Sequence, residues 1–185
     1  MLPIVQAPKP VLASIASPIQ KIDKTITALI KEMTESLLYA KDPEGVGLAA
    51  PQVGKSLQLF IIKESKKDPL LVFINPKLVI PTGEKLQTND ESDNEHHEVK
   101  LEGCLSLQDI WGIVHRYPKV ELVYLDEKGE KHQDTFEGFM ATIIQHEFDH
   151  LQGVLFPRRV LEQKGQLYKS VKNKKGEMEF EEISV

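Results

Sequence analysis

Apolar residues recur along the first part of the chain with two periods, one helical and one extended. Residues 22–37 carry an apolar stripe at the spacing of one helix face, and Asp23 is placed to cap the start of that helix. The stretches 57–63 (LQLFIIK) and 69–80 (PLLVFINPKLVI) are rich in β-branched and aromatic residues, which predicts strands. Pro76 has no amide proton, so it either limits the second strand to a sheet edge or marks a break in its pairing.

The middle of the chain predicts a polar loop followed by a β-hairpin. Residues 81–98 are polar and mostly acidic. His96 and His97 lie among these acids, and we expect them to be solvated rather than to bind a metal. Residues 117–138 (YPKVELVYLDEKGEKHQDTFEG) predict two strands joined by a turn at DEKGE.

Two further segments complete the order of elements. Residues 138–152 predict a helix, and residues 154–185 predict a short link, a helical segment and a final strand. Because strands follow strands rather than alternating with helices, we expect an α+β fold with antiparallel sheets packed around the central helix 138–152. No repeat or linker divides the sequence, so residues 1–185 are expected to form a single domain.

Composition and charge narrow the class of protein. The chain has 185 residues, of which 41% are hydrophobic and 28% charged, and its formal net charge is −5. This balance argues against a disordered chain and against a general nucleic-acid binder, so no DNA partner is expected. No apolar run approaches the ~20 residues that span a membrane, and we expect no targeting segment at the N-terminus.

The helix over 138–152 is apolar over most of its circumference, yet it carries two histidines and a glutamate. One face holds Phe139, Ile143, His146, Glu147 and His150. The imidazoles of His146 and His150, four residues apart, can reach one cation, and Glu147 gives the His-Glu-x-x-His pattern of a metal site with an adjacent general base. A narrow stripe is left for water or hydrogen-bonding partners: Ala141, Gln145, Asp149 and Gln152. Gly153 is expected to end the helix.

Two histidines do not complete a tetrahedral catalytic site, in which three protein ligands leave the fourth position to water. The only cysteine, Cys104, is the natural candidate for the third ligand and lies in the glycine-containing stretch LEGCLSLQD. The alternative is that Cys104 is a small buried hydrophobe. A thiolate with two neutral imidazoles suits Zn²⁺, Fe²⁺, Co²⁺ or Ni²⁺.

Three motifs occur in order along the chain: GVGLAAPQVG (45–54), EGCLS (102–106) and QHEFDHL (145–151). Together they make the sequence resemble the peptide deformylases, which remove the N-formyl group from the formyl-methionine of new bacterial and organellar polypeptides. The resemblance implies a bacterial-type, cytoplasmic hydrolase that acts on N-formylmethionyl nascent peptides. It also implies one divalent metal per chain, with Fe²⁺ as the expected ion and Zn²⁺, Ni²⁺ or Co²⁺ as substitutes.

The resemblance further implies a role for each residue of the site. The metal ligands would be Cys104, His146 and His150. Glu147 would take a proton from the attacking water and pass it to the leaving amine. The side-chain amide of Gln52 and the backbone N–H of Leu105 would stabilise the oxyanion that develops on the substrate.

Four residues are expected on the substrate side. Val46 and Gly47 belong to the first motif, and Gly47 would allow the backbone to come close to the substrate. Phe139 and Ile143 share the histidine face of the helix. They are either an apolar pocket for the methionine side chain or plain core residues.

The sequence departs from the family pattern in places that concern the substrate rather than the reaction. Gln108 stands where a proline is common, and Trp111 lies in the region where an arginine is often found, with the first arginine at position 116. The acidic loop 84–98 lengthens the chain between the first two motifs. Separately, residues 158–175 contain seven basic residues and one acid, Glu162. This segment is either a solvated basic face or a docking site for ribosomal RNA.

Two other classes of protein fit part of the pattern. A His-Glu-x-x-His endopeptidase would need a third ligand downstream of the helix, but residues 151–185 contain no histidine or cysteine. A catalytically inactive relative that serves as a binding module would show damage at Glu147, Gln52 or Cys104, and all three are intact. The three ordered motifs therefore favour a deformylase.

Overall fold

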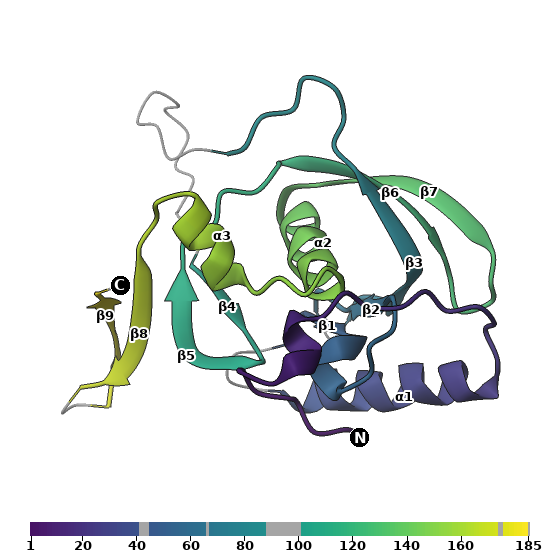
Figure 1. The fold of residues 1–185 in the computed structure, drawn as a ribbon, viewed down its shortest axis with the longest axis horizontal. Coiled ribbons are helices and arrows are strands. Elements are labelled where there is room, and N and C mark those ends of the chain that lie inside the picture. Colours follow the sequence, from purple (N-terminus) through teal and green to yellow (C-terminus); the bar gives the residue numbers. More distant parts are fainter. Residues whose placement is uncertain (41–44, 66, 88–100, 174–175, 185) are drawn as a thin grey trace.

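The computed structural model in Figure 1 describes residues 1–40, 45–65, 67–87, 101–173 and 176–184. Its helices are α1 (Lys24–Tyr39), α2 (Gly138–Leu151) and α3 (Phe156–Glu162), with short 3-10 turns η1 (Pro10–Ala13) and η2 (Ala50–Val53). Its strands are β1 (Gly47–Ala49), β2 (Leu59–Ile62), β3 (Leu71–Val79), β4 (Glu102–Cys104), β5 (Leu107–Gly112), β6 (Lys119–Leu125), β7 (Lys131–Glu137), β8 (Leu167–Lys172) and β9 (Met178–Ile183).

The strands form two antiparallel sheets. The five-stranded sheet has the order β1-β2-β3-β6-β7, and the four-stranded sheet has the order β4-β5-β8-β9. Every pair of neighbouring strands is antiparallel. The single-domain α+β fold expected from the sequence is therefore confirmed.

Helices α1 and α2 cover opposite faces of the five-stranded sheet, which explains why β2 is apolar at every position. Leu59 and Ile61 of β2 pack with α1, while Phe60 and Ile62 pack with α2. All four side chains are fully buried. Successive side chains of a strand point to opposite faces, so a strand with both faces covered must be apolar throughout.

Several local predictions are confirmed. The Asp23 carboxylate caps α1 by accepting two backbone N–H groups of its first turn, at 2.9 and 3.2 Å, and the predicted hairpin is β6–β7. Pro76 marks a break and not an edge, because β3 lies in the middle of its sheet and its pairing with β6 shifts register between Ile74 and Lys77. Pro76 therefore lies where the regular hydrogen-bond ladder is interrupted, so its lack of an N–H breaks no regular pairing.

The C-terminal tail contains one more strand than the sequence predicts. The expected helical segment and final strand are α3 and β9, but β8 lies between them and pairs with both β5 and β9. The hairpin β8–β9 thus extends the second sheet away from the rest of the molecule (Figure 1). Residues 88–98 of the predicted acidic loop, His96 and His97 included, lie outside the described residues.

Helix α2 runs between the two sheets (Figure 1). Its side toward the five-stranded sheet carries Ala141, Ile143, Ile144 and Leu151. Gly153 follows the helix with a φ of 67° and ends it, as predicted. A Cβ atom at Gly153 would stand 2.6 Å from the carbonyl carbon of Ala13. The end of α2 is therefore packed directly against the backbone of the N-terminal segment.

The glycine that begins α2 and the glycine that follows it offer a matched test of this packing. Gly138 and Gly153 both have positive φ, but a Cβ at Gly138 would meet nothing within 4 Å. We expect Gly138→Ala to lower the free energy of unfolding by about 1 kcal/mol, the cost of a left-handed alanine. We expect Gly153→Ala to lower it by about 3 kcal/mol, because overpacking adds to the same strain. Urea unfolding of both variants measures the difference, and equal losses would show that the contact with Ala13 contributes nothing.

Candidate metal centre

Three donor atoms converge where α2 faces β4. His146 and His150 lie one turn apart on α2, and Cys104 ends β4. Their ligand atoms all lie within 4.8 Å of one another, and Cys104 Sγ is 3.3 Å from His150 Nε2. A tetrahedral ion with metal–sulfur and metal–nitrogen bonds near 2.3 and 2.0 Å would separate such atoms by about 3.6 Å. One thiolate and two imidazoles at this spacing fit a single divalent metal ion.

A carboxylate fixes the orientation of the first histidine. His146 Nδ1 lies 2.6 Å from Glu102 Oε1, which leaves the other ring nitrogen to face Cys104. Arg116 holds the same carboxylate from the far side, with Nε and Nη2 donating to its two oxygens at 3.1 and 2.8 Å. Burial alone would raise the pKa of Glu102, but the charges of His146 and Arg116 lower it to about 2. Glu102 is therefore an ionised partner of the kind that orients metal-binding histidines.

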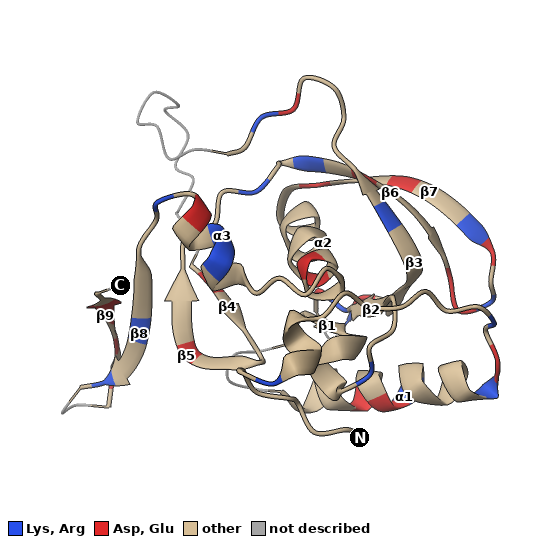
Figure 2. Ribbon diagram, viewed as in Figure 1, with Lys and Arg blue, Asp and Glu red and all other residues tan. Residues whose placement is uncertain are grey.

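Two polar residues of the narrow stripe on α2, Gln145 and Asp149, are buried and hydrogen-bonded. Asp149 accepts from Arg116 Nη1 at 2.7 Å and from Arg159 Nη2 at 2.6 Å. Gln145 exchanges two hydrogen bonds with the backbone of Tyr117. For Gln145 and Asp149 the alternative of hydrogen-bonding partners is correct, whereas Gln152 is exposed to water and Ala141 packs in the core. Figure 2 shows the acidic positions of α2 at the centre of the molecule.

The Glu147 carboxylate lies against the backbone of the first motif. A Cβ atom at Gly47 would overlap its Oε1 atom and stand 2.8 Å from its Cδ atom. Glu147 is 3% exposed, and its Oε2 atom has no hydrogen-bond partner among the residues that the structure describes. Burial raises the pKa of Glu147 to about 7. Gly47 thus makes room for this carboxylate, a contact that the sequence does not predict.

Gln52 presents a hydrogen-bond donor to the same site. It lies in η2 and is fully buried. Its Oε1 accepts the backbone N–H of Ala49 at 2.8 Å, so its Nε2 faces Cys104 Sγ at 3.5 Å. Leu105 follows Cys104 directly in the chain. The three metal-binding side chains therefore lie close to the two residues that are expected to stabilise the oxyanion, Gln52 and Leu105.

A second cluster of potential ligands lies apart from this centre. Asp126, Glu130 and His132 come together at the turn between β6 and β7. The Asp126 carboxylate already accepts from the backbone N–H groups of Lys128 and Glu130 and lies 3.0 Å from His132 Nε2. These bonds complete a turn, and they leave the buried Cys104 group as the metal centre.

The fold and sequence match one family of known proteins. A model of the polypeptide deformylase family matches residues 1–166. A peptide deformylase from Pseudothermotoga lettingae is 39% identical over 147 residues, which cover 80% of this chain and 75% of that protein. The chain belongs to the polypeptide deformylase family.

Solved deformylase structures share this fold. A peptide deformylase from Synechococcus elongatus in complex with actinonin is 37% identical, has a TM-score of 0.71, and covers 85% of this chain and 78% of that one. A class I type b peptide deformylase from Acinetobacter baumannii with Met-Ala-Ser bound is 31% identical, has a TM-score of 0.70, and covers 86% and 98% of the two chains. The expected family is confirmed, and the chain is a metal-dependent amidohydrolase that removes N-formyl groups from nascent polypeptides.

The family assignment decides between the classes that the sequence left open. The third donor of this deformylase is Cys104 from β4, upstream of the helix, and not a downstream residue as an endopeptidase would need. The metal site is therefore Cys104, His146 and His150. Among the described residues, no helix combines the length and apolarity that a membrane crossing needs.

The four residues expected on the substrate side of the deformylase lie at different depths. Val46 is half-buried at the edge of the core, and Gly47 abuts Glu147. Ile143 is 4% exposed within the core, whereas Phe139 is 45% exposed on the first turn of α2, two turns before His146. The structure thus brings Gly47 to the centre but does not bring Phe139 to it.

The N-terminal segment supports the site, although no pattern in the sequence marks it. Val5 donates its N–H to the carbonyl of Gln52 at 2.7 Å, and Ala7 donates to that of Ser106 at 3.0 Å. Gln6 Nε2 donates to the carbonyl of Leu105 at 2.9 Å. One short segment therefore ties the backbone of the first motif to that of the second.

Removing the charge of Glu102 should loosen the metal. Glu102→Gln keeps the shape of the side chain but leaves Arg116 with one carboxylate partner fewer and His146 with a weaker acceptor. We expect metal affinity, measured by competition with a chelator, to fall about 10- to 100-fold, as it does for other groups that orient metal-binding histidines. The matched control is Glu162→Gln, whose exposed carboxylate binds Arg158 and Arg159 on α3. Unchanged affinity in Glu102→Gln would show that this carboxylate does not orient His146.

Proposed function

We propose that Glu147 is the proton carrier of the deformylation reaction and that the bond it serves is the N-terminal formamide of N-formylmethionyl peptides. One observation carries this proposal. The carboxylate is buried beside the three donors, and its Oε2 atom has no hydrogen-bond partner among the described residues. A buried acceptor without a partner is costly unless a reacting group uses it.

The chemistry follows from the groups that surround the carboxylate. A divalent cation held by Cys104, His146 and His150 would supply Lewis acidity and an acidified water, because coordination lowers the pKa of water from ~15.7 toward ~7. Glu147 accepts a proton from the attacking water as the water oxygen adds to the formyl carbon. The same carboxyl then donates a proton to the amine nitrogen as the carbon–nitrogen bond breaks. The products are formate and a peptide with a free amino terminus.

Two hydrogen-bond donors would stabilise the negative charge that develops on the formyl oxygen. We assign these to the Nε2 of Gln52 and the backbone N–H of Leu105. The bond from Ala49 to Gln52 Oε1 supports this assignment, because it prevents the amide from turning its acceptor end to the substrate. Each preorganised donor of this kind lowers the barrier by roughly 3–4 kcal/mol.

The substrate would enter beside the first motif. We place the peptide along Val46 and Gly47 and its methionine side chain against Ile143, with the exposed Phe139 at the outer rim. The relative that holds Met-Ala-Ser supports a peptide that begins with methionine. Ile143 is buried one turn before Glu147, so it can offer apolar surface close to the reacting group.

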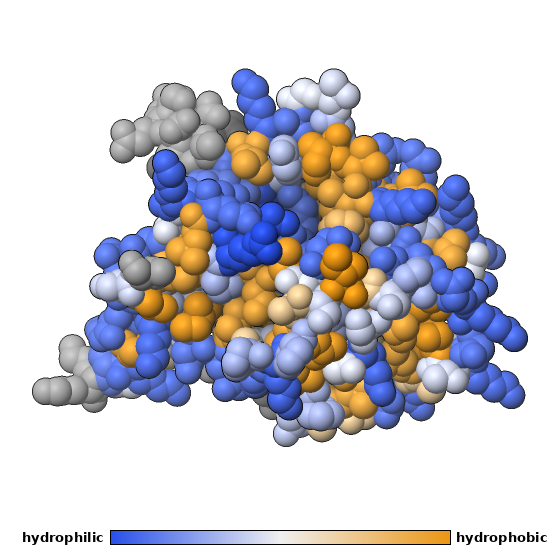
Figure 3. All heavy atoms as spheres, viewed as in Figure 1, coloured by the Kyte–Doolittle hydropathy of each residue, from blue (hydrophilic) through white to orange (hydrophobic). Residues whose placement is uncertain are grey.

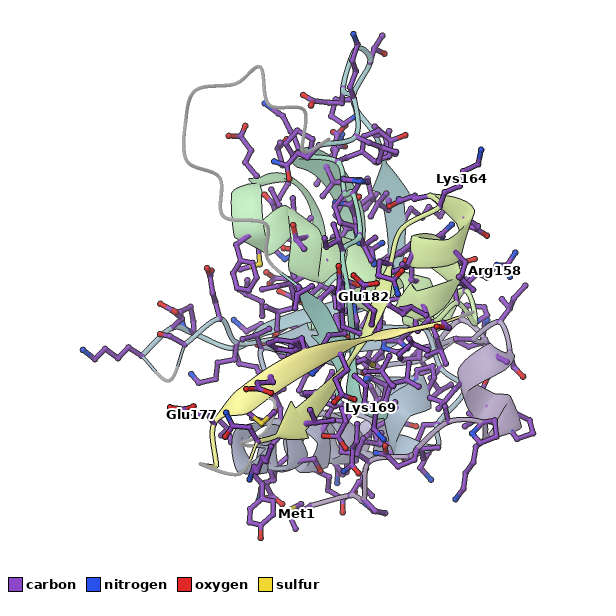
Figure 4. All side chains as sticks on the ribbon, turned by 90° about the vertical axis from the view of Figure 1, so that its left-hand side faces the viewer. Met1, Arg158, Lys164, Lys169, Glu177 and Glu182 are labelled. Atoms are coloured by element: carbon purple, nitrogen blue, oxygen red, sulfur yellow. The ribbon has the colours of Figure 1, made fainter. Side chains whose placement is uncertain are left out.

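We also propose a cytoplasmic location and a contact with ribosomal RNA through residues 158–175, where the enzyme would meet nascent chains. Lys164 and Lys169 are exposed along this segment (Figure 4). Glu181 of β9 is the cross-strand partner of Lys169 and offsets part of its charge. Phosphate contacts weaken steeply with salt, so co-sedimentation with ribosomes over a salt series tests this contact.

The two arginines of the segment add little to such a contact. Arg158 pairs with Glu162 at 2.9 Å, and Arg159 pairs with both Glu162 and Asp149. Both lie on α3, over which the surface is strongly hydrophilic (Figure 3). Because their charge is already neutralised within the chain, the lysines carry the proposed contact.

The proposed native ion is Fe²⁺, with Zn²⁺, Ni²⁺ or Co²⁺ as substitutes, because one thiolate with two imidazoles suits all four. The iron form should then lose activity in air, since a thiolate beside a redox metal enters the oxidation ladder. The nickel and cobalt forms should keep their activity over the same incubation. Formate release and metal content are measured on anaerobic and aerobic samples of each form. A verified iron form that is indifferent to air would count against iron as the vulnerable native metal.

Two adjacent substitutions on α2 should separate ligand from proton carrier. His146→Ala removes one of three ligands, so we expect loss of the metal and, with it, loss of activity. Glu147→Ala leaves all three ligands in place, so we expect about one metal per chain but activity reduced by at least 10²–10⁴-fold, the usual contribution of general acid–base catalysis. Metal analysis and formate release from a formyl-Met peptide are measured on the same samples.

The pattern of the two results decides the role of Glu147. If Glu147→Ala loses its metal as fully as His146→Ala, the carboxylate is a ligand or a structural support. If it keeps both metal and full activity, the proton travels by another route. Either result rejects the proposed mechanism.

A further inference from the structure

The strand that carries one of the three metal donors, Cys104, is paired on one side only. β4 has three residues, lies at the end of its sheet and pairs with β5 alone. Its pairing shifts register between Gly103 and Cys104. Yet β4 must hold two groups in place, the ligand Cys104 and the Glu102 carboxylate that orients His146. Backbone hydrogen bonds to one neighbour are a weak restraint on so short an edge strand.

A tryptophan covers the back of this strand. Trp111 on β5 is the cross-strand partner of Gly103. A Cβ atom at Gly103 would stand 2.7 Å from Trp111 Cζ3 and 2.8 Å from Cε3, so the indole ring lies directly on the glycine. Because side chains alternate along a strand, this contact is on the face opposite to Glu102, which contacts α2. Cys104 packs with α3 and lies against His150, on that same side as Glu102. An aromatic ring over a strand glycine restores the packing that the glycine lacks.

The C-terminal hairpin holds that ring in turn. Phe180 on β9 meets Trp111 edge-to-face, with ring centroids 5.9 Å apart and an interplanar angle of 83°. Within the described part of the chain, the buried Nε1 of Trp111 has no hydrogen-bond partner, so packing alone positions the ring. The hairpin β8–β9 begins after residue 166, where the match to the family model ends. Figure 4 looks onto this hairpin, with Lys169 and Glu182 labelled on its two strands.

We propose that the C-terminal hairpin positions the metal centre through an aromatic brace formed by Phe180, Trp111 and Gly103. Phe180 limits the movement of the Trp111 ring, and the ring presses β4 toward α2. Without the brace, β4 can move away from His146 and His150, and the metal is held less tightly. Phe180 and Trp111 are positioning residues, since neither touches the donors. The inference rests on the Cys104–His146–His150 site and is independent of the role proposed for Glu147.

The chain offers a matched pair of substitutions to test the brace. Phe180 and Met178 lie two residues apart on the same face of β9, at 47% and 44% exposure, so Phe180→Ala and Met178→Ala remove similar exposed surface. Phe180→Tyr keeps the aromatic edge and serves as the rescue variant. Trp111 is the only tryptophan, so its fluorescence reports the position of the ring directly. Co²⁺ is the probe metal, and its affinity is measured by chelator competition and by cobalt–thiolate absorption.

We expect Phe180→Ala to shift the Trp111 emission to the red and to weaken Co²⁺ binding about tenfold, the lower end of what outer groups contribute to a metal site. Activity at limiting metal should fall with occupancy, while KM for a formyl-Met peptide should stay unchanged at saturating metal. Met178→Ala and Phe180→Tyr should behave like the unaltered chain.

Several results would overturn the brace. Co²⁺ affinity in Phe180→Ala equal to that in Met178→Ala would show that the ring contact is only surface packing. Emission unchanged in Phe180→Ala would show that Phe180 does not position the ring. Failure of the unaltered chain to bind one Co²⁺ would reject the metal centre itself, and the brace and the proposed mechanism with it.

Discussion

The structure depends on one buried carboxylate, Glu102, held between His146 and Arg116. A buried charge is tolerated only when opposite charges and hydrogen bonds surround it. Positive and negative side chains alternate outward from Glu102: Arg116 binds Asp149, and Asp149 binds Arg159. Each donor–acceptor distance is at or below 3.1 Å. This chain of ion pairs joins β4, α2 and α3. Removing any inner member leaves a charge unpaired in the core, so the network locates β4 relative to α2, and with it Cys104 relative to the histidines.

Each side of α2 contacts a different part of the molecule. Its apolar side packs against the five-stranded sheet, and its histidines face β4. Gln145 and Asp149 bind Tyr117 and Arg116, which lie just before β6. Glu147 is left between the histidines and the backbone of Gly47. The helix needs little solvent-facing surface because Gln145 and Asp149 have hydrogen-bond partners and His146, Glu147 and His150 face the metal centre.

The sequence predicts best those features that are decided locally. The cap at Asp23, the turn of the β6–β7 hairpin and the end of α2 at Gly153 depend on residues within a few positions of one another. The three donors could also be named, because residue type and spacing carry the chemistry of a metal site. For these features the local signal and the tertiary structure agree.

The sequence does not predict features that exist only through tertiary contact. β1 and β4 have only three residues each and are strands because the next strand pairs with them, and β8 joins its sheet through the distant β5. The tie from Gln6 to Leu105 spans 99 positions, and Gln6 belongs to none of the three motifs. Burial of Asp149 could not be read from its place on a polar stripe, since Arg116 and Arg159 come from other elements. The strand propensity of such segments is weak, and context decides it.

Trp111, one of the departures near the second motif, packs against the C-terminal hairpin. An arginine at position 111 would carry its charged group into water and need no cover. An indole there has more apolar surface to bury, and it lies on Gly103 with its other side open to the next strands. β8 pairs with β5 at this residue, Tyr168 to Trp111, and β9 brings Phe180 onto the ring. The surface of Trp111 is thus covered by a segment that lies beyond residues 1–166, the part of the chain that matches the family model.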